Sequence, residues 1–204
     1  MITVYGAAPS RALRVLWMLE EMGLEYQVHQ IDFANRFDDA DFIAASPPGF
    51  MPGFKDGDVR MMESVAIIDY LSRRYGPTPL AVREDEPGFP AYLQFLHFGE
   101  ASIAGPLNVT MGSRFFAPED QKQNWGATFA VDMVAQRANA VADVLKRSEY
   151  VAANRFTAAD ISLGYALGLA EPFGFADRLD PALTDYVARL KQRPAYQRAS
   201  AHRV

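Results

Sequence analysis

The chain of 204 residues contains no cysteine. Without a thiol it can form no disulfide, no cysteine-ligated metal site and no cysteine nucleophile, so any thiol chemistry requires the thiol of another molecule. Histidine is also scarce, with three residues. His97 and Glu100 have the spacing of two ligands on one helical face, but so few histidines leave such a site incomplete. We therefore expect no metal site.

Long hydrophobic runs and an excess of positive charge are absent too. No apolar segment reaches about 18 residues, and Arg11, Arg14 and Glu20 interrupt the first apolar stretch, so the sequence predicts neither a membrane span nor a secretory signal. The formal net charge of −5 argues against nucleic-acid binding, because such proteins gather Lys and Arg to neutralise phosphates. We expect a soluble, cytoplasmic protein with no membrane or nucleic-acid partner.

The first part of the chain alternates strand and helix signals. Residues 2–5 and 26–31 have the pattern of short strands. Apolar spacing over residues 11–22 predicts a helix between them, with Gly23 at the position of a C-terminal cap. Strand, helix and strand within about 30 residues predict a βαβ unit.

A turn-rich segment follows, with Met51-Pro52 at the start of a short extended run. The dipeptide Asp56-Gly57 between two such runs predicts a β-hairpin. A helix is expected over about residues 64–75, where apolar residues recur at helical spacing. This arrangement predicts a cradle for a small anionic peptide, because the start of a helix offers free N–H groups to an anion.

A segment rich in proline follows and indicates a domain boundary. Its prolines are Pro77, Pro79, Pro87 and Pro90. A continuous element cannot pass through them, so we place an α/β domain at residues 1–77, a linker at 78–88 and an all-helical domain at 89–204.

One helix start in the second domain is unusually explicit. Thr157 is the expected N-cap and Asp160 its capping-box partner, while Phe156 and Ile161 form a hydrophobic staple. We assign this motif to folding rather than to catalysis, with the cap stabilising the fold by about 1 kcal/mol.

Taken together, these features resemble the cytosolic glutathione transferases, in particular bacterial-type members with a serine-type active site. The resemblance covers nearly the whole chain, and its marks are Ser10-Arg11, residues 14–21, Gly23, Met51-Pro52, residues 63–67, residues 156–161 and residues 193–196. It implies a thioredoxin-like α/β domain at residues 1–77, an all-α second domain, glutathione as co-substrate and a homodimer.

The resemblance also implies a glutathione site in the first domain. Pro52 is expected to be a cis proline, with the backbone of Met51 paired to the cysteinyl part of glutathione. Glu63 is expected to meet the ammonium of the γ-glutamyl end, and Ser64 its carboxylate. The alternatives are that Pro52 only begins an edge strand and that Ser64 is only an N-cap.

Activation of the thiol is assigned to Ser10. A free thiol titrates near a pH of about 8.5, so a donor that stabilises the thiolate is needed at neutral pH. In several branches of the family the catalytic serine lies five residues before the residue that matches Arg14, and Pro9 occupies that place here; other bacterial and fungal members have a serine directly before an arginine, as in Ser10-Arg11. Tyr5 is a second candidate donor, and an N-cap role is the structural alternative for Ser10.

Two further expectations concern the rest of the ligand. Phe50 stands where many relatives carry Lys, Arg or Gln, so the glycyl carboxylate of glutathione has no evident cationic partner. The electrophile pocket is expected between the two domains. Its candidate wall residues, for which core packing is an equal alternative, are Phe98, Ile103, Met111, Arg114 and Phe115.

These expectations lead to a detoxifying transferase that conjugates glutathione to small hydrophobic electrophiles. Two alternatives stay open. One is a glutathione-dependent isomerase or dehalogenase, and the other is a glutathione-transferase-like binding or interaction protein without turnover, which Pro9 favours.

Overall fold

The computed structural model describes residues 1–122 and 124–203. They form two compact units. The sheet unit consists of Met1–Ala81 together with the residues from Lys191 on, and the helical unit is Val82–Leu190. The sequence predicted one helical domain over 89–204, whereas the structure groups the residues from Lys191 on with the sheet unit.

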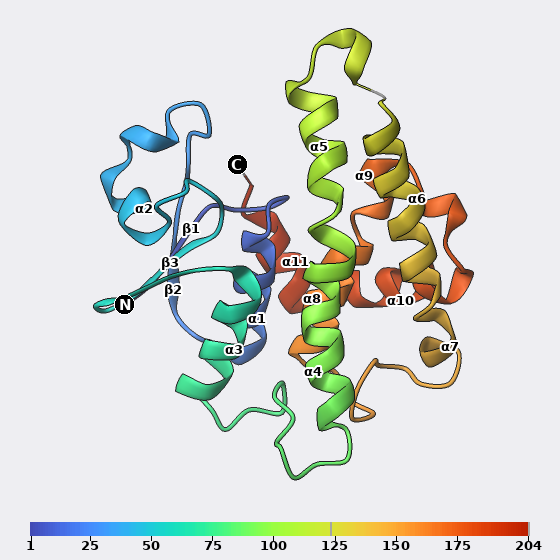
Figure 1. The fold of residues 1–204 in the computed structure, drawn as a ribbon. Coiled ribbons are helices and arrows are strands. Elements are labelled where there is room, and N and C mark those ends of the chain that lie inside the picture. Colours follow the sequence, from blue (N-terminus) through green and yellow to red (C-terminus); the bar gives the residue numbers. More distant parts are fainter. Residues whose placement is uncertain (123, 204) are drawn as a thin grey trace. The chain divides into compact units, whose positions relative to one another are not determined.

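A mixed β-sheet lies in the sheet unit (Figure 1). Its strands within the described residues are β1 (Ile2–Tyr5), β2 (Tyr26–His29), β3 (Gly53–Asp56) and β4 (Val59–Met62), in the order β2-β1-β3-β4. The strands β1 and β2 are parallel, and the other neighbouring pairs are antiparallel. The predicted hairpin is confirmed, with Gly57 in the left-handed conformation that its turn requires.

Helices cover both faces of this sheet. They are α1 (Ala12–Met22), α2 (Ala40–Ala45) and α3 (Ser64–Arg74), with α1 and α3 on one side of the sheet and α2 on the other (Figure 1). The helix α1 is buried over most of its length and ends at Gly23, which has a φ of 65°. This thioredoxin-like arrangement confirms the predicted fold of the first domain.

The helix α11 (Pro194–Ala201) belongs to the sheet unit because it packs on α1. Arg193 donates two hydrogen bonds to Glu21, from Nε to Oε1 at 2.6 Å and from Nη2 to Oε2 at 2.8 Å. The rings of Trp17 and Tyr196 meet edge to face, with centroids 5.0 Å apart. The sequence did not reveal this packing, since the partners are far apart along the chain.

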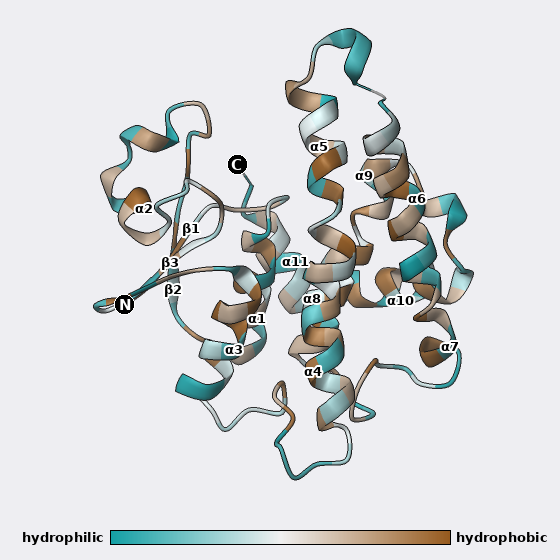
Figure 2. Cartoon of the chain, viewed as in Figure 1, coloured by the Kyte–Doolittle hydropathy of each residue, from teal (hydrophilic) through white to brown (hydrophobic). Residues whose placement is uncertain are grey.

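The helical unit confirms the predicted all-α second part. Its α-helices within the described residues are α4 (Phe89–Phe98), α5 (Leu107–Phe116), α6 (Trp125–Asn139), α7 (Ala142–Leu145), α8 (Ala158–Leu167), α9 (Ala170–Phe173) and α10 (Pro181–Lys191). A π-helical turn, Gly99–Ala104, follows α4. The turn Glu119–Gln121 after α5 is hydrophilic (Figure 2), whereas every residue of α8 is buried. No helix of the described ranges is long and apolar enough to span a membrane.

The predicted capping box stands at the start of α8. The Asp160 carboxylate accepts hydrogen bonds from the N–H of Thr157 at 2.8 Å and the N–H of Val151 at 3.1 Å, and from the hydroxyls of Thr157 at 3.2 Å and Tyr186 at 2.7 Å. Burial raises the pKa of Asp160, and these donors oppose the shift. Asp160 therefore joins three segments of the helical unit.

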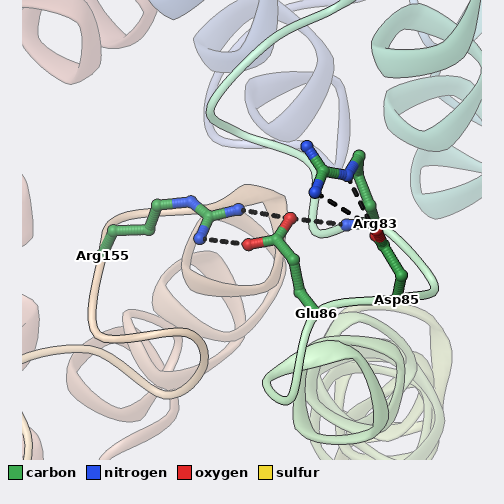
Figure 3. Close-up of polar contacts among 4 residues, drawn as sticks. All are labelled: Arg83, Asp85, Glu86 and Arg155. Atoms are coloured by element: carbon green, nitrogen blue, oxygen red, sulfur yellow. Dashed lines mark hydrogen bonds and ion pairs between the residues drawn. The ribbon is translucent and has the colours of Figure 1, made fainter.

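The part of the proline-rich segment that belongs to the helical unit is held there by Glu86 (Figure 3). Arg155, two residues before the capping box, donates from Nη1 to Oε2 of Glu86 at 2.8 Å and from Nη2 to Oε1 at 3.2 Å. Oε1 also accepts the backbone N–H of Arg83 at 2.8 Å. The Arg155 hydrogen bond holds the pKa of Glu86 below its usual value.

We predict that Asp160→Ala lowers the free energy of unfolding by about 3 to 5 kcal/mol, because it leaves four donors without their acceptor. Chemical denaturation of the variant measures this loss. Asp185→Ala, at an exposed position of α10, is the matched control and should change stability by less than about 0.5 kcal/mol. A loss below about 1 kcal/mol for Asp160→Ala would contradict the assignment.

The Glu86 ion pair predicts a pH dependence of stability. Because the folded-state pKa is lowered, the stabilisation is present at neutral pH and is lost as the pH falls below about 4.3, the ordinary Glu value, through the folded-state pKa. Glu86→Gln should therefore be less stable than the parent at pH 7 and approach it in acid. Urea unfolding of both proteins between pH 7 and 3 tests this, and a difference that does not change with pH would refute it.

Candidate functional site

The loop before β3 is held by a buried serine. The Ser46 hydroxyl donates to the carbonyl of Phe50 at 2.7 Å and accepts the N–H of Phe50 at 3.2 Å. The Met51–Pro52 peptide bond that follows is cis, as the resemblance implies. Among the described residues, the backbone N–H and C=O of Met51 have no hydrogen-bond partner. This backbone can therefore pair with an extended peptide ligand.

Met51 lies directly against the end of β1. A Cβ added to Gly6, which has a φ of 102°, would stand 2.7 Å from the sulfur of Met51. Any larger residue would displace the Met51 side chain and would also be strained at this φ. Gly6 thus brings the β1–α1 loop and the Met51 loop together.

The start of α3 combines a free helix end with a buried cation. Arg14, which has no exposed surface, donates from Nη1 to the hydroxyl of Ser64 at 3.2 Å. Glu63 precedes the helix with a φ of 73°, a conformation that costs a non-glycine residue about 1 to 3 kcal/mol. The N–H groups of the first turn and the nearby guanidinium favour an anion at this point. Glu63 is exposed beside them and can meet a cation.

Ser10 lies in the β1–α1 loop, where its hydroxyl is engaged by the backbone. It donates to the carbonyl of Ala7 at 2.6 Å and accepts the N–H of Ala12 at 3.2 Å. These contacts are those of a turn and cap residue. To donate to a thiolate, the Ser10 hydroxyl must first break its hydrogen bond to the Ala7 carbonyl. Pro9, the alternative position in the family pattern, is exposed and has no donor.

Tyr5 is a poor candidate for the thiol donor. Its side chain is 1% exposed and packs with Ile31, Phe42 and Ala45. The hydroxyl donates to Oδ2 of Asp41 at 3.4 Å, and burial raises the pKa of Tyr5. The Tyr5 hydroxyl is therefore already engaged by Asp41.

Arg36 is a candidate site residue that the sequence did not single out. Its guanidinium lies over the rings of Phe33 at 4.1 Å and Phe37 at 4.5 Å, and Nη1 donates to the carbonyl of Phe33 at 2.7 Å. A Cβ added to Gly49 would stand 3.3 Å from Arg36 Nε, which has no hydrogen-bond partner within the described part of the chain. Arg36 is therefore a cation beside Gly49, the residue that precedes Phe50. The only indication of this site in the sequence is an arginine between two phenylalanines, Phe33 and Phe37.

The candidate pocket residues of the helical unit differ in their exposure. Ile103 is fully buried, so it is a core residue and not a pocket wall. Phe98 is half-buried against Phe95. Met111 and Phe115 of α5 are exposed, the latter at 72%.

Arg114 of α5 is exposed and donates to the carbonyls of Pro172 at 3.4 Å and Phe173 at 2.9 Å. These contacts give it a structural role within the helical unit. Among the residues that the structure describes, no group of three or more His, Asp or Glu side chains could hold a metal ion.

Comparison with known proteins adds a family and a fold. Residues 1–73 match the family model "Glutathione S-transferase, N-terminal domain". The chain is 26% identical over 205 residues to glutathione S-transferase 3 of Schizosaccharomyces pombe, covering 96% of this chain and 85% of the relative. The sequence similarity thus extends beyond the sheet unit.

Two solved structures have the same fold. A glutathione transferase of Methylococcus capsulatus is 22% identical, covers 98% of both chains and has a TM-score of 0.83. Ure2p, a yeast prion protein solved in complex with glutathione, is 19% identical, covers 97% of both chains and has a TM-score of 0.85. At these identities the likeness shows the fold alone.

Proposed function

This chain belongs to the cytosolic glutathione transferase superfamily, and we propose that it binds glutathione and conjugates its thiolate to small hydrophobic electrophiles. The observation that carries the proposal is the arrangement of Met51, Ser64 and Arg14 in the sheet unit. A peptide-like backbone edge and an anion-binding helix start lie on one small domain. Glutathione has the two matching features, a cysteinyl backbone and a γ-glutamyl carboxylate.

In this proposal each end of glutathione has its own partners. The γ-glutamyl carboxylate accepts hydrogen bonds from Ser64 and the first N–H groups of α3, in the field of Arg14. The α-ammonium pairs with Glu63, whose left-handed backbone is supported by this role. The cysteinyl N–H and C=O pair with the backbone of Met51, next to Pro52.

Arg36 supplies the cation for the glycyl carboxylate. Phe50, which occupies the position where many relatives have a polar or basic residue, is 69% exposed and cannot bind an anion. Arg36, from the turn before α2, lies next to Gly49 in the loop that carries Phe50, and its Nε has no hydrogen-bond partner among the described residues. The stacked phenylalanines limit the motion of its guanidinium, which reduces the entropy lost on binding.

Thiol activation is assigned to Ser10, after its hydroxyl turns from Ala7 to sulfur. A single donor of this kind contributes about 2.7 to 4 kcal/mol to a reacting anion. Hydrophobic electrophiles would contact exposed apolar side chains of α5, such as Met111 and Phe115. The proposal includes a homodimer, a cytoplasmic location and a role in detoxification, which only the family resemblance supports.

A second candidate is a glutathione-binding protein without turnover. The specific observation in its favour is the Ser10 hydroxyl, which donates to Ala7, together with Pro9 at the commoner serine position. The two candidates share the ligand and differ only in the fate of the thiol.

We predict that glutathione raises the free energy of unfolding by about 2.7 kcal/mol at a concentration of 100 times its Kd. Ser64→Ala should weaken binding about 10-fold, because the carboxylate loses a hydrogen bond and Arg14 loses one of its acceptors. Titration calorimetry and thermal unfolding measure both effects. Ser72→Ala, a buried serine later in α3, should bind like the parent. No binding of glutathione at millimolar concentration would end both candidate functions.

Ser10→Ala should lower kcat with an activated aryl halide by about 10²- to 10³-fold, while KM for glutathione changes less than about 3-fold. The pKa of the bound thiol, followed by the ultraviolet absorbance of the thiolate, should rise toward about 8.5. Ser10→Thr keeps the hydroxyl and is the control. If kcat survives in Ser10→Ala, Ser10 is only a turn residue.

Arg36→Ala should weaken glutathione binding about 10-fold, because a charge-assisted hydrogen bond is lost. The same variant should bind the analogue with a glycinamide end as tightly as the parent does. Arg73→Ala, at an exposed ion-paired position of α3, is the matched control. Equal losses for the acid and the amide would show that Arg36 does not contact the carboxylate.

A further inference from the structure

A short segment after α11, His202–Arg203, lies beside the loop that carries Ser10. The N–H of Ala8 donates to the carbonyl of His202 at 3.0 Å. Ala8 and Arg203 also form an isolated parallel β-bridge. Both partners belong to the sheet unit, although nearly 200 residues separate them along the chain. The β1–α1 loop is thus fixed by residues that no local sequence pattern connects with it.

The His202 side chain is itself held in place. Tyr26 donates its hydroxyl hydrogen to Oε1 of Glu20 at 2.6 Å, and the same hydroxyl lies 3.1 Å from Nε2 of His202. A hydroxyl has one hydrogen, so Nε2–H of His202 is the donor to the Tyr26 oxygen. The two rings also meet edge to face, with centroids 5.8 Å apart.

The Glu20 carboxylate is also held by an arginine. Arg198 donates from Nε to Oε2 of Glu20 at 2.6 Å, which joins the last turn of α11 to α1. Burial raises the pKa of Glu20, but the hydrogen bonds from Tyr26 and Arg198 outweigh it and leave the pKa lowered. His202 is therefore connected through Tyr26 and Glu20 to a fixed helix.

We propose that His202 is a positioning residue for the β1–α1 loop and, through Ala8, sets the place of the Ser10 hydroxyl. This inference rests on the proposed function, in which Ser10 serves the thiol. Few contacts separate His202 from the Ser10 hydroxyl. The carbonyl of Ala7 accepts both the N–H of Ser10 at 3.0 Å and its hydroxyl at 2.6 Å, and Ala7 precedes the residue that His202 holds.

The proposal predicts an effect on chemistry rather than on affinity. His202 contacts Ala8 and Tyr26, whereas glutathione is assigned to Met51, Glu63 and Ser64, which lie on other segments. A displaced Ser10 hydroxyl weakens stabilisation of the thiolate, and small displacements of such donors have large effects on rate.

The test compares His202→Ala with His202→Gln, whose amide N–H can still donate to Tyr26. His202→Ala should lower kcat about 10-fold, leave KM for glutathione within about 3-fold and raise the pKa of the bound thiol. His202→Gln should recover most of kcat, and Tyr26→Phe, which removes the acceptor, should behave like His202→Ala. His97→Ala, an exposed histidine of α4, is the control and should be unchanged.

Amide hydrogen exchange of Ala8 gives a readout that needs no activity. His202→Ala and Tyr26→Phe should speed exchange at Ala8, because the acceptor carbonyl of His202 is less firmly held. Unchanged exchange overturns the proposal, as does faster exchange with kcat and thiol pKa unchanged. A parent protein that binds no glutathione would refute the proposed function instead, while the exchange experiment would still judge the role of His202.

Discussion

The contact between Arg14 and Ser64 is the interaction on which the proposed site depends. A fully buried guanidinium is costly unless it is hydrogen-bonded, and here one of its hydrogen bonds goes to the first residue of α3. The charge therefore lies next to the helix end where the field of the backbone already favours an anion. The same contact joins α1 to α3 and so fixes the position of Glu63. In the proposed function, structure and ligand binding thus use the same buried cation.

A second feature is that residues from two distant parts of the chain build the sheet unit. The helix α11 is fastened to α1 by Arg193 and Arg198, which pair with Glu21 and Glu20. The segment after it reaches the β1–α1 loop at Ala8. The position of the β1–α1 loop therefore depends on residues that follow the helical unit in the sequence.

Local patterns made much of this structure predictable. Features that depend on residues close together in the sequence were predicted from their spacing. They are the strands, the Asp56-Gly57 hairpin, the Gly23 cap and the Asp160 capping box. The docking of α11, the stacked Arg36 and the His202 contact depend on groups that meet only after folding. Nor could spacing show that the Ser10 hydroxyl donates to Ala7 or that Ile103 is a core residue. The roles of Ser10, Met51, Pro52, Glu63 and Ser64 toward glutathione stay predictions.

The most direct test of the account is a crystal structure of this protein with glutathione. We predict that the γ-glutamyl carboxylate lies within hydrogen-bond distance of Ser64 and that the cysteinyl backbone is paired with Met51. The Ser10 hydroxyl should then lie close to sulfur, with its hydrogen bond to Ala7 broken. Glutathione bound away from the start of α3, or bound there with Met51 unpaired, would contradict the central claim.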